Sequence, residues 1–302
     1  MPSNKLLCDS DLHGGIMKNY LIFLFFILFI SNAIADESSF IKHGVAISYD
    51  KENIAYSVYG SGNRALIFVH GWSCDSRYWV NQLHSFAKKY KVITVDLGGH
   101  GNSSSTRSDF TINSFAKDIQ AVVEQEAIDN IILIGHSMGG PVVVSTARLL
   151  PNKVKGVIGV DTLHDISVKI SQSDLNAAIK PFEESYNKTM SAFVASLFIQ
   201  NTDKKLKRWI SLDMVSATKP VAISAYSNFM AQYKTGESSS VFENMNIPII
   251  TINAKLWPTN VKGNESKIKY YQSIFIEGTG HFPMLEKPIL FNSLLEKAIQ
   301  GI

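Results

Sequence analysis

The sequence Ile131-Ile-Leu-Ile-Gly-His-Ser-Met-Gly-Gly140 runs from four aliphatic residues into a G-x-S-x-G pentapeptide, and Pro141 and an apolar helical pattern follow it. This order predicts a buried strand, a sharp turn and a helix. Glycine is needed at 135 and 139 because only small neighbours let the strand and the helix approach closely around a serine in a strained backbone conformation. Ser137 is therefore the candidate nucleophile.

Five further apolar runs are similar to the run before Ser137. Each is apolar at successive positions, which is typical of a parallel strand buried on both faces. Most are separated by helical patterns, so the sequence predicts an α/β fold with a mostly parallel, doubly wound sheet and ligands at the carboxyl ends of its strands. Two alternating segments, 44–48 and 54–59, predict a hairpin before them. The five runs cover 65–69, 92–95, 157–160, 249–252 and 274–276.

The interval 166–240 breaks this alternation because it has no strand-like run. Its apolar residues recur at helical spacing in four stripes, the last of them opened by Pro220. The sequence therefore predicts an all-helical cap inserted after the sixth strand, with an α/β core formed by 36–165 and 241–302. Cap residues that are not needed for packing are expected to line a pocket for an apolar or acyl-bearing substrate.

The amino terminus has the pattern of a secretory signal peptide. An apolar segment at 20–30 follows Met17-Lys18, and Ala33-Ile-Ala35 provides the small residues of a cleavage site. We therefore expect 17–35 to be the signal peptide, 1–16 to be an upstream extension, and the mature protein to be periplasmic or secreted. The apolar segment is shorter than the roughly 20 residues that span a bilayer, so no stable membrane insertion is expected after cleavage.

Composition excludes several classes of function. The net charge is only +3 and no basic run is interleaved with aromatic residues, so no nucleic-acid partner is expected. Cys8 lies in the predicted extension, which leaves Cys74 as the single thiol of the mature chain and allows no internal disulfide. No His or Cys pair has metal-ligand spacing, and no cofactor is implied. The expected partner is a small molecule, and the oligomeric state is left open.

A serine hydroxyl becomes a good nucleophile only when a base takes its proton, and this base is usually a histidine oriented by a carboxylate. The segment after the last strand run supplies His281 at the same sheet edge as Ser137. His281 is therefore the candidate general base, whereas His136 is expected to have a packing role. Two backbone N–H groups should stabilise an oxyanion, one from Met138 and one from Trp72.

Four ordered motifs resemble those of the α/β-hydrolase superfamily. They are H-G-W at 70–72, D-x-x-G-x-G-x-S at 96–103, G-H-S-M-G-G at 135–140 and G-x-G-H-F at 278–282. The chain is most similar to the capped branch of lactonases, esterases and C–C bond hydrolases, and the resemblance covers nearly all of 44–300. Ser137 excludes the aspartate-nucleophile members, which are the epoxide hydrolases and haloalkane dehalogenases.

The chain departs from the family at the third residue of the triad. In the family the acid usually follows the seventh strand, but here Trp257 stands where that aspartate belongs, and Lys255 replaces an aspartate of a similar bacterial subgroup. Some members take the acid from the end of the sixth strand, and the resemblance then implies Asp161. Asp165 is the alternative acid, and Asn253 is a neutral substitute.

Together these features predict an exported serine hydrolase that cleaves a carboxylic ester or lactone with an apolar moiety through an acyl-enzyme. The expected triad is Ser137, His281 and Asp161. The resemblance leaves open acyl transfer, perhydrolysis and C–C hydrolysis by the same triad. A ligand-binding or signalling relative with little turnover is the alternative that the missing acid at position 257 favours.

Overall fold

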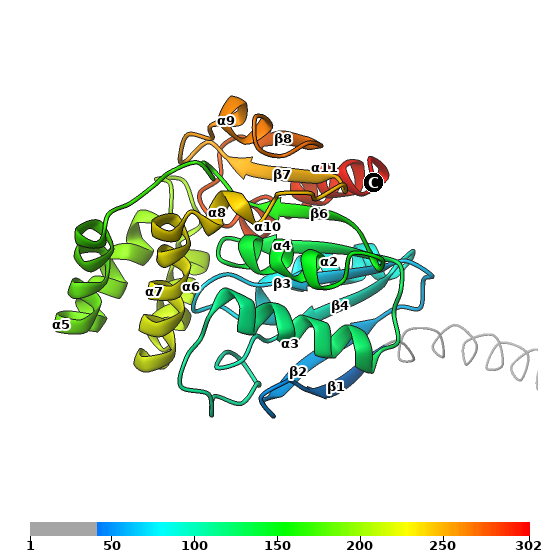
Figure 1. The fold of residues 1–302 in the computed structure, drawn as a ribbon, viewed down its shortest axis with the longest axis horizontal. Helices are drawn as coiled ribbons and strands as arrows, with labels where there is room; N and C mark the ends of the chain where they lie inside the picture. Colours follow the sequence, from blue (N-terminus) through cyan, green and yellow to red (C-terminus); the bar gives the residue numbers. More distant parts are fainter. Residues whose placement is uncertain (1–40) are drawn as a thin grey trace, which may run out of the picture. The chain divides into compact units, whose positions relative to one another are not determined.

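The computed structural model describes residues 41–302, so the predicted signal peptide and the extension before it lie outside the described residues. Within 41–302, eight strands form one sheet in the order β1-β2-β4-β3-β5-β6-β7-β8 (Figure 1). β2 is antiparallel to β4, and the pairings from β4 to β8 are parallel. The strands are β1 (Ile41–Ile47), β2 (Asn53–Tyr59), β3 (Ala65–Val69), β4 (Lys91–Val95), β5 (Ile131–His136), β6 (Val154–Val160), β7 (Ile249–Ala254) and β8 (Tyr271–Ile276).

Every residue of the central strands β3 and β5 is buried. Successive side chains of a strand point to opposite faces, so a run that is apolar at every position requires cover on both sides. Helices α3 (Ile112–Gln125) and α4 (Gly139–Leu149) pack together on one face, and α2 (Val80–Ala87) and α11 (Pro288–Gln300) pack together on the other (Figure 1). The predicted doubly wound, mostly parallel sheet is confirmed.

Local sequence determines where several helices begin and end. α3 begins with a capping box, in which the Thr111 hydroxyl accepts the Ser114 N–H and the Ser114 hydroxyl accepts the Thr111 N–H, each at 2.9 Å. Ser171 and Asp174 form the same arrangement at the start of α5 (Gln172–Ser196). Helix α7 (Lys219–Thr235) ends at Gly236, whose φ of 81° lies in the left-handed region that glycine adopts at little energetic cost.

Four helices fill the interval between β6 and β7, namely α5 (Gln172–Ser196), α6 (Lys204–Val215), α7 (Lys219–Thr235) and α8 (Glu237–Ser240). This is the all-helical insertion after the sixth strand that the sequence predicts, although its first two stripes belong to one helix, α5, which kinks at Ser185. α5 packs on α6 and α7, and these three helices lie beyond the carboxyl ends of the strands (Figure 1). Along residues 41–302, no helix has both the length and the apolar character needed to cross a membrane.

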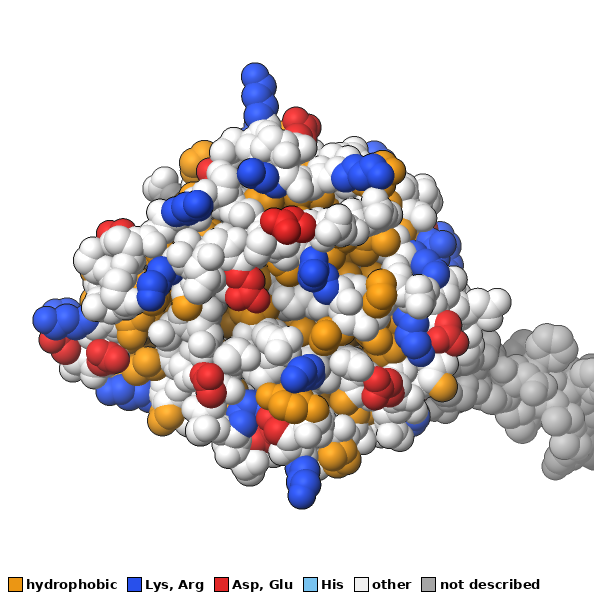
Figure 2. All heavy atoms as spheres, viewed as in Figure 1, with side chains coloured by type: hydrophobic (Ala, Val, Ile, Leu, Met, Phe, Trp, Pro, Cys, Tyr) orange, Lys and Arg blue, Asp and Glu red, His pale blue; other side chains and the backbone are white. Residues whose placement is uncertain are grey.

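The remaining elements are short helices in the connections, η1 (Ser76–Trp79), α9 (Val261–Glu265) and α10 (Pro283–Glu286). On the face shown in Figure 2, basic side chains are interspersed with acidic ones. This face therefore has no concentrated charge of one sign, the feature that would attract a polyanion.

Candidate active site

Ser137 lies on the turn between β5 and α4, in the left-handed backbone region at φ 51°. This conformation is strained for a residue with a side chain, and hydrogen bonds hold it in place. The Ser137 N–H donates to Val160 O at 3.0 Å, and the Thr162 hydroxyl donates to Ser137 O at 2.7 Å. A Cβ on Gly135 would lie 2.2 Å from Gly139 O, so only glycine allows the approach of strand and helix. The turn has the geometry of a nucleophile elbow.

The loops after β6 and β8 bring Asp161 and His281 together. His281 Nδ1 lies 2.5 Å from Asp161 Oδ2, and both side chains are buried. The ring N–H donates to this oxygen, while Asp161 Oδ1 accepts the N–H of Ala254 at 2.8 Å. Because Nδ1 holds its proton toward the carboxylate, Nε2 is the ring nitrogen that can accept a proton.

Burial controls the protonation of this pair. Burial raises the pKa of Asp161 to about 6, although His164 and the Ala254 N–H oppose the rise. The carboxyl group is therefore mostly ionised at pH 7. Burial also lowers the pKa of His281, so its imidazole is neutral at that pH. A neutral imidazole beside an ionised carboxylate is the state in which a histidine can act as a general base.

The alternative acid, Asp165, does not meet His281. Its Oδ1 accepts hydrogen bonds from the backbone N–H and the hydroxyl of Ser167, at 2.9 and 2.5 Å, and its Oδ2 accepts one from Asn260 at 2.9 Å. These bonds stabilise the turn after Asp165. The structure therefore brings together His281 and Asp161, the first of the two carboxylates that the sequence offered.

Asn253, near the end of β7, and Trp257, in the segment after it, lie close to the candidate acid and base without replacing the acid. Asn253 Oδ1 accepts the N–H of Thr162 at 3.1 Å, and its amide donates back to Thr162 O at 3.0 Å, so it braces the loop that carries Asp161. Trp257, at the position where the family has its aspartate, packs its ring on His281 with centroids 5.0 Å apart. Asn253 therefore supports the loop that carries Asp161, and Trp257 packs on His281.

The loop after β3 lies against the nucleophile turn. A Cβ on Gly71 would lie 3.0 Å from Ser137 Cβ and 2.8 Å from His136 Nδ1, so a larger residue would displace one of them. Within residues 41–302, the backbone N–H groups of Trp72 and Met138 have no hydrogen-bond partner. Two free donors beside a serine are the arrangement that an oxyanion hole requires.

Two histidines hold this region by hydrogen bonds that the sequence does not reveal. His136 Nε2 lies 2.8 Å from His281 O and donates to it, so the residue predicted to pack also supports the backbone of the candidate base. His70 Nε2 accepts the Leu97 N–H at 3.0 Å, and its Nδ1 therefore carries the proton and donates to Gly71 O at 2.8 Å. Hydrophobic periodicity has no signal for such bonds between distant segments.

The cap holds the loop that carries His281. The His281 N–H donates to Leu197 O at the end of α5, at 2.8 Å. Glu286 accepts the N–H of Gly280 at 3.0 Å and the hydroxyl of Thr202 at 2.6 Å. The position of the candidate base therefore depends on the cap as well as on the core.

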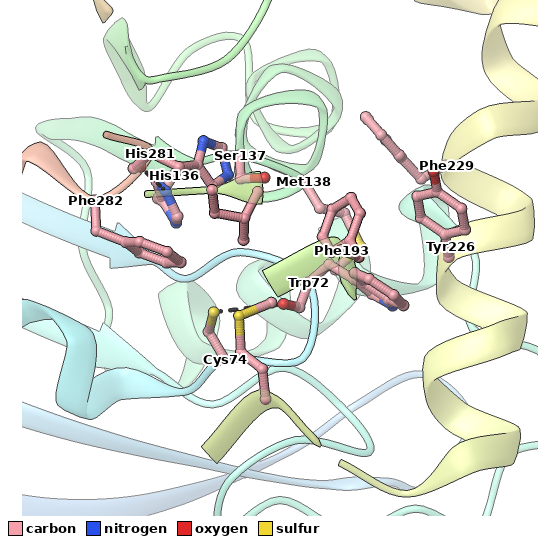
Figure 3. Close-up of a pocket in the computed structure, with 12 residues that line it drawn as sticks. Trp72, Cys74, His136, Ser137, Met138, Phe193, Tyr226, Phe229, His281 and Phe282 are labelled. Atoms are coloured by element: carbon pink, nitrogen blue, oxygen red, sulfur yellow. Dashed lines mark hydrogen bonds between the residues drawn. The ribbon is translucent and has the colours of Figure 1, made fainter. Parts of the chain in front are cut away.

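A small cavity lies beside Ser137 and His281, between the core and the cap (Figure 3). Its volume is about 40 Å³, whereas sites for drug-sized ligands occupy roughly 300–1,000 Å³. The wall is mostly apolar and aromatic, with Trp72 packed on Tyr226 and Phe193 at centroid distances of 4.7 and 5.3 Å. The lining residues are Trp72, Cys74, His136, Ser137, Met138, Phe193, Leu197, Met214, Tyr226, Phe229, His281 and Phe282.

This set of groups matches the chemistry of acyl transfer, which needs a nucleophile, an oriented base and oxyanion donors. Among residues 41–302, no group of three or more His, Cys, Asp or Glu side chains is arranged to hold a metal ion. The family described as alpha/beta hydrolase fold matches residues 64–288, and the chain belongs to this family. The resemblance carried by the four motifs is thereby confirmed.

Several relatives of the chain are esterases. It is 24% identical over 261 residues to a pimeloyl-[acyl-carrier protein] methyl ester esterase of Wigglesworthia glossinidia brevipalpis. This match covers 81% of this chain and 97% of the relative. An esterase structure from Exiguobacterium antarcticum matches with a TM-score of 0.75 and 18% identity, over 86% of this chain and 100% of its own. An esterase structure from a Rhodococcus species matches with a TM-score of 0.70 and 25% identity, over 85% of this chain and 98% of its own.

Proposed function

We propose that the protein is a serine hydrolase that cleaves a carboxylic ester through an acyl-enzyme, with Ser137, His281 and Asp161 as its triad. The observation that carries this proposal is the 2.5 Å contact between His281 Nδ1 and Asp161 Oδ2. A buried carboxylate there selects the tautomer in which Nε2 can take the serine proton. The family and its esterase relatives support a carboxylic ester hydrolase, the enzyme class that the sequence predicts.

In the proposed mechanism, Ser137 Oγ attacks the acyl carbon of the ester while its proton passes to His281 Nε2. The carbonyl oxygen becomes an oxyanion and accepts hydrogen bonds from the N–H groups of Trp72 and Met138. The tetrahedral intermediate then collapses, the C–O bond to the alcohol breaks, and the alcohol oxygen takes the proton from His281. A water molecule, deprotonated by the same histidine, attacks the acyl-enzyme and releases the acid. Asp161 stabilises the imidazolium in both halves.

The lining of the cavity supports an ester or lactone with an apolar portion. Phe193, Tyr226 and Leu197 leave little charge to bind a polar group near Ser137. The cavity volume of about 40 Å³ favours a short acyl group, because each further methylene group needs space that these side chains occupy. We therefore propose acetyl and propionyl esters as the preferred substrates, with longer chains accepted only where the cap moves.

A fluorophosphonate probe tests the nucleophile. Wild-type protein should be labelled covalently, and Ser137→Ala should not be labelled while it keeps the wild-type melting temperature. Hydrolysis of a p-nitrophenyl ester series and a lactone panel then identifies the substrate class. A folded wild-type protein that neither reacts with the probe nor hydrolyses any ester would overturn the proposal and would favour a ligand-binding relative.

Acyl transfer and perhydrolysis would use the same triad, so product analysis separates these two reactions from hydrolysis. An ester with an isotopically labelled acyl group is incubated with the protein in three reactions, in water alone, with an added alcohol and with hydrogen peroxide. Each reaction should yield chiefly the free acid. A dominant transfer product would replace hydrolase with acyltransferase or perhydrolase.

We also propose that the protein is exported, since residues 17–35 have the composition of a signal peptide. Amino-terminal sequencing of the protein from periplasmic and extracellular fractions should find a chain that begins at Asp36. Full-length protein confined to the cytoplasmic fraction would contradict this proposal without affecting the proposed chemistry.

A further inference from the structure

His164 places a second imidazole beside the carboxylate of Asp161. It belongs to the same loop after β6, and its Nε2 lies 3.7 Å from Asp161 Oδ1. This nitrogen is buried and has no hydrogen-bond partner within residues 41–302. A buried polar atom without a partner requires an explanation, and the mechanism above makes no use of His164.

A chain of hydrogen bonds determines which nitrogen of His164 carries the proton. Asn253 Oδ1 accepts the N–H of Thr162, which sets the orientation of the Asn253 amide. The amide group then donates to Thr162 O at 3.0 Å and to Thr259 Oγ1 at 3.1 Å. His164 Nδ1 faces the Thr259 hydroxyl at 3.0 Å and the amide nitrogen of Asn253, which is a donor, at 3.5 Å. A lone pair on Nδ1 suits both contacts, whereas a hydrogen there would oppose the amide, so the Thr259 hydroxyl is assigned as the donor. Nδ1 is therefore an acceptor, and the neutral ring carries its proton on Nε2, the nitrogen nearest Asp161.

We propose that His164 is a positioning residue for the triad acid: its Nε2–H, held in direction by Thr259, stabilises the ionised Asp161 carboxylate at Oδ1 while Oδ2 binds His281. The separation of 3.7 Å is longer than a normal hydrogen bond. The effect is therefore electrostatic, and it acts in a buried setting where water screens it little. The inference rests on the proposed function, which makes Asp161 the acid.

The groups that face this carboxylate come from four elements. His164 lies on the loop after β6, which also carries Asp161 itself. His281 lies on the loop after β8, His136 at the end of β5, and the Ala254 N–H at the end of β7. Burial lowers the pKa of His164, His136 and His281, so these imidazoles are neutral at pH 7. The N–H groups of His281, Ala254 and His164 thus present neutral dipoles to the Asp161 carboxylate, whereas the N–H of His136 donates to His281 O.

The test compares His164→Leu, which removes the N–H, with His164→Gln, which retains a donor on a side chain of similar length. kcat and KM for p-nitrophenyl acetate are measured from pH 5 to pH 9. In His164→Leu the acid limb of the kcat profile should move up by about one pH unit, because the carboxylate has lost a stabilising dipole. With the wild-type pKa of Asp161 at about 6, this corresponds to an activity about fivefold lower at pH 6 and nearly tenfold lower at pH 5, with little change at pH 8.5 and an unchanged KM. His164→Gln should recover most of the shift.

Thr259→Val provides a second route if His164→Leu does not fold. It leaves His164 in place but removes the hydroxyl that directs its tautomer, and it should move the acid limb in the same direction by a smaller amount. An acid limb at the wild-type position in these variants, or the same loss of activity at every pH, would overturn the proposal.

A carbon-13 NMR titration of the Asp161 carboxyl group separates this inference from the proposed function, because it requires no turnover. The signal is assigned by its absence in Asp161→Asn. A higher pKa in His164→Leu than in wild type would uphold the inference even for a protein without esterase activity. An equal pKa would overturn it even for an active esterase.

Discussion

The indole Nε1–H of Trp72 donates a hydrogen bond to the carbonyl oxygen of Ala222 in cap helix α7, 2.8 Å away. The backbone N–H of the same residue is a proposed oxyanion donor, so a single residue joins the cap to the reaction site. Its ring is also packed against Phe193 and Tyr226 of the cap. A displacement of α7 would therefore move the loop that lies against Ser137.

Trp72→Phe tests this connection, because it keeps an aromatic ring in the cap cluster and removes only the indole donor. We expect kcat/KM for p-nitrophenyl acetate to fall about fivefold to tenfold, since a hydrogen bond of about 1 kcal/mol no longer holds the loop. Trp209→Phe is the matched control, because this cap tryptophan packs on Tyr78 of the core and is not part of the cavity wall. Equal activities of the two variants would show that the Trp72 bond has no effect on catalysis.

Asp161→Asn should lower kcat for ester hydrolysis by about 10⁴-fold, because a carboxamide stabilises the wrong tautomer of His281. Asp165→Asn is the control, since the Asp165 carboxylate bonds to Ser167 and Asn260 instead. It should retain most of the wild-type activity. Steady-state kinetics with both variants decides between the two acids, and the reverse ranking would move the triad acid to Asp165.

The same Asp161→Asn variant should gain stability relative to wild type as the pH rises. Burial raises the pKa of Asp161 from 3.8 to about 6. The contribution of its uncharged form is therefore complete below pH 4 and is lost as the pH rises through 6. Asparagine does not titrate, so the free energy of unfolding of the variant minus that of wild type should increase by about 2–3 kcal/mol between pH 4 and pH 7.5. Urea denaturation at the two pH values measures this difference, and a constant difference would contradict the raised pKa.

Phe193→Ala should change the acyl-chain preference. The ring lies half-buried in the wall of the cavity, and its removal would make room for additional methylene groups. We expect the ratio of kcat/KM for p-nitrophenyl octanoate to that for the acetate to rise about tenfold or more. Leu212→Ala is the control, because Leu212 also lies in the cap but is 64% exposed. A ratio that stays at the wild-type value would place the acyl site outside this cavity.

The carboxyl ends of the strands explain why much of the candidate site was predictable. Ser137 follows the fully buried strand β5, and His281 follows the edge strand β8, of which only Ile276 is buried. Parallel strands bring their carboxyl ends to one edge of the sheet. The acid was less certain because Asp161 and Asp165 follow the same strand, only four positions apart. Asp161 turns toward His281 at a φ of 45°, whereas Asp165 is held by Ser167. No local pattern distinguishes these two directions.

By itself, the sequence determined the sheet, the helical cap and the edge at which the site lies, because hydrophobic periodicity, glycine spacing and helix caps are local properties of the chain. Only the tertiary structure decided that Asp161 meets His281, that Trp257 packs where the family has an acid, and that His164 faces the same carboxylate. The small volume of the cavity also depends on how α5, α6 and α7 pack against the core. These features join residues that are far apart along the chain, and their distances and burial exist only once the loops are folded together.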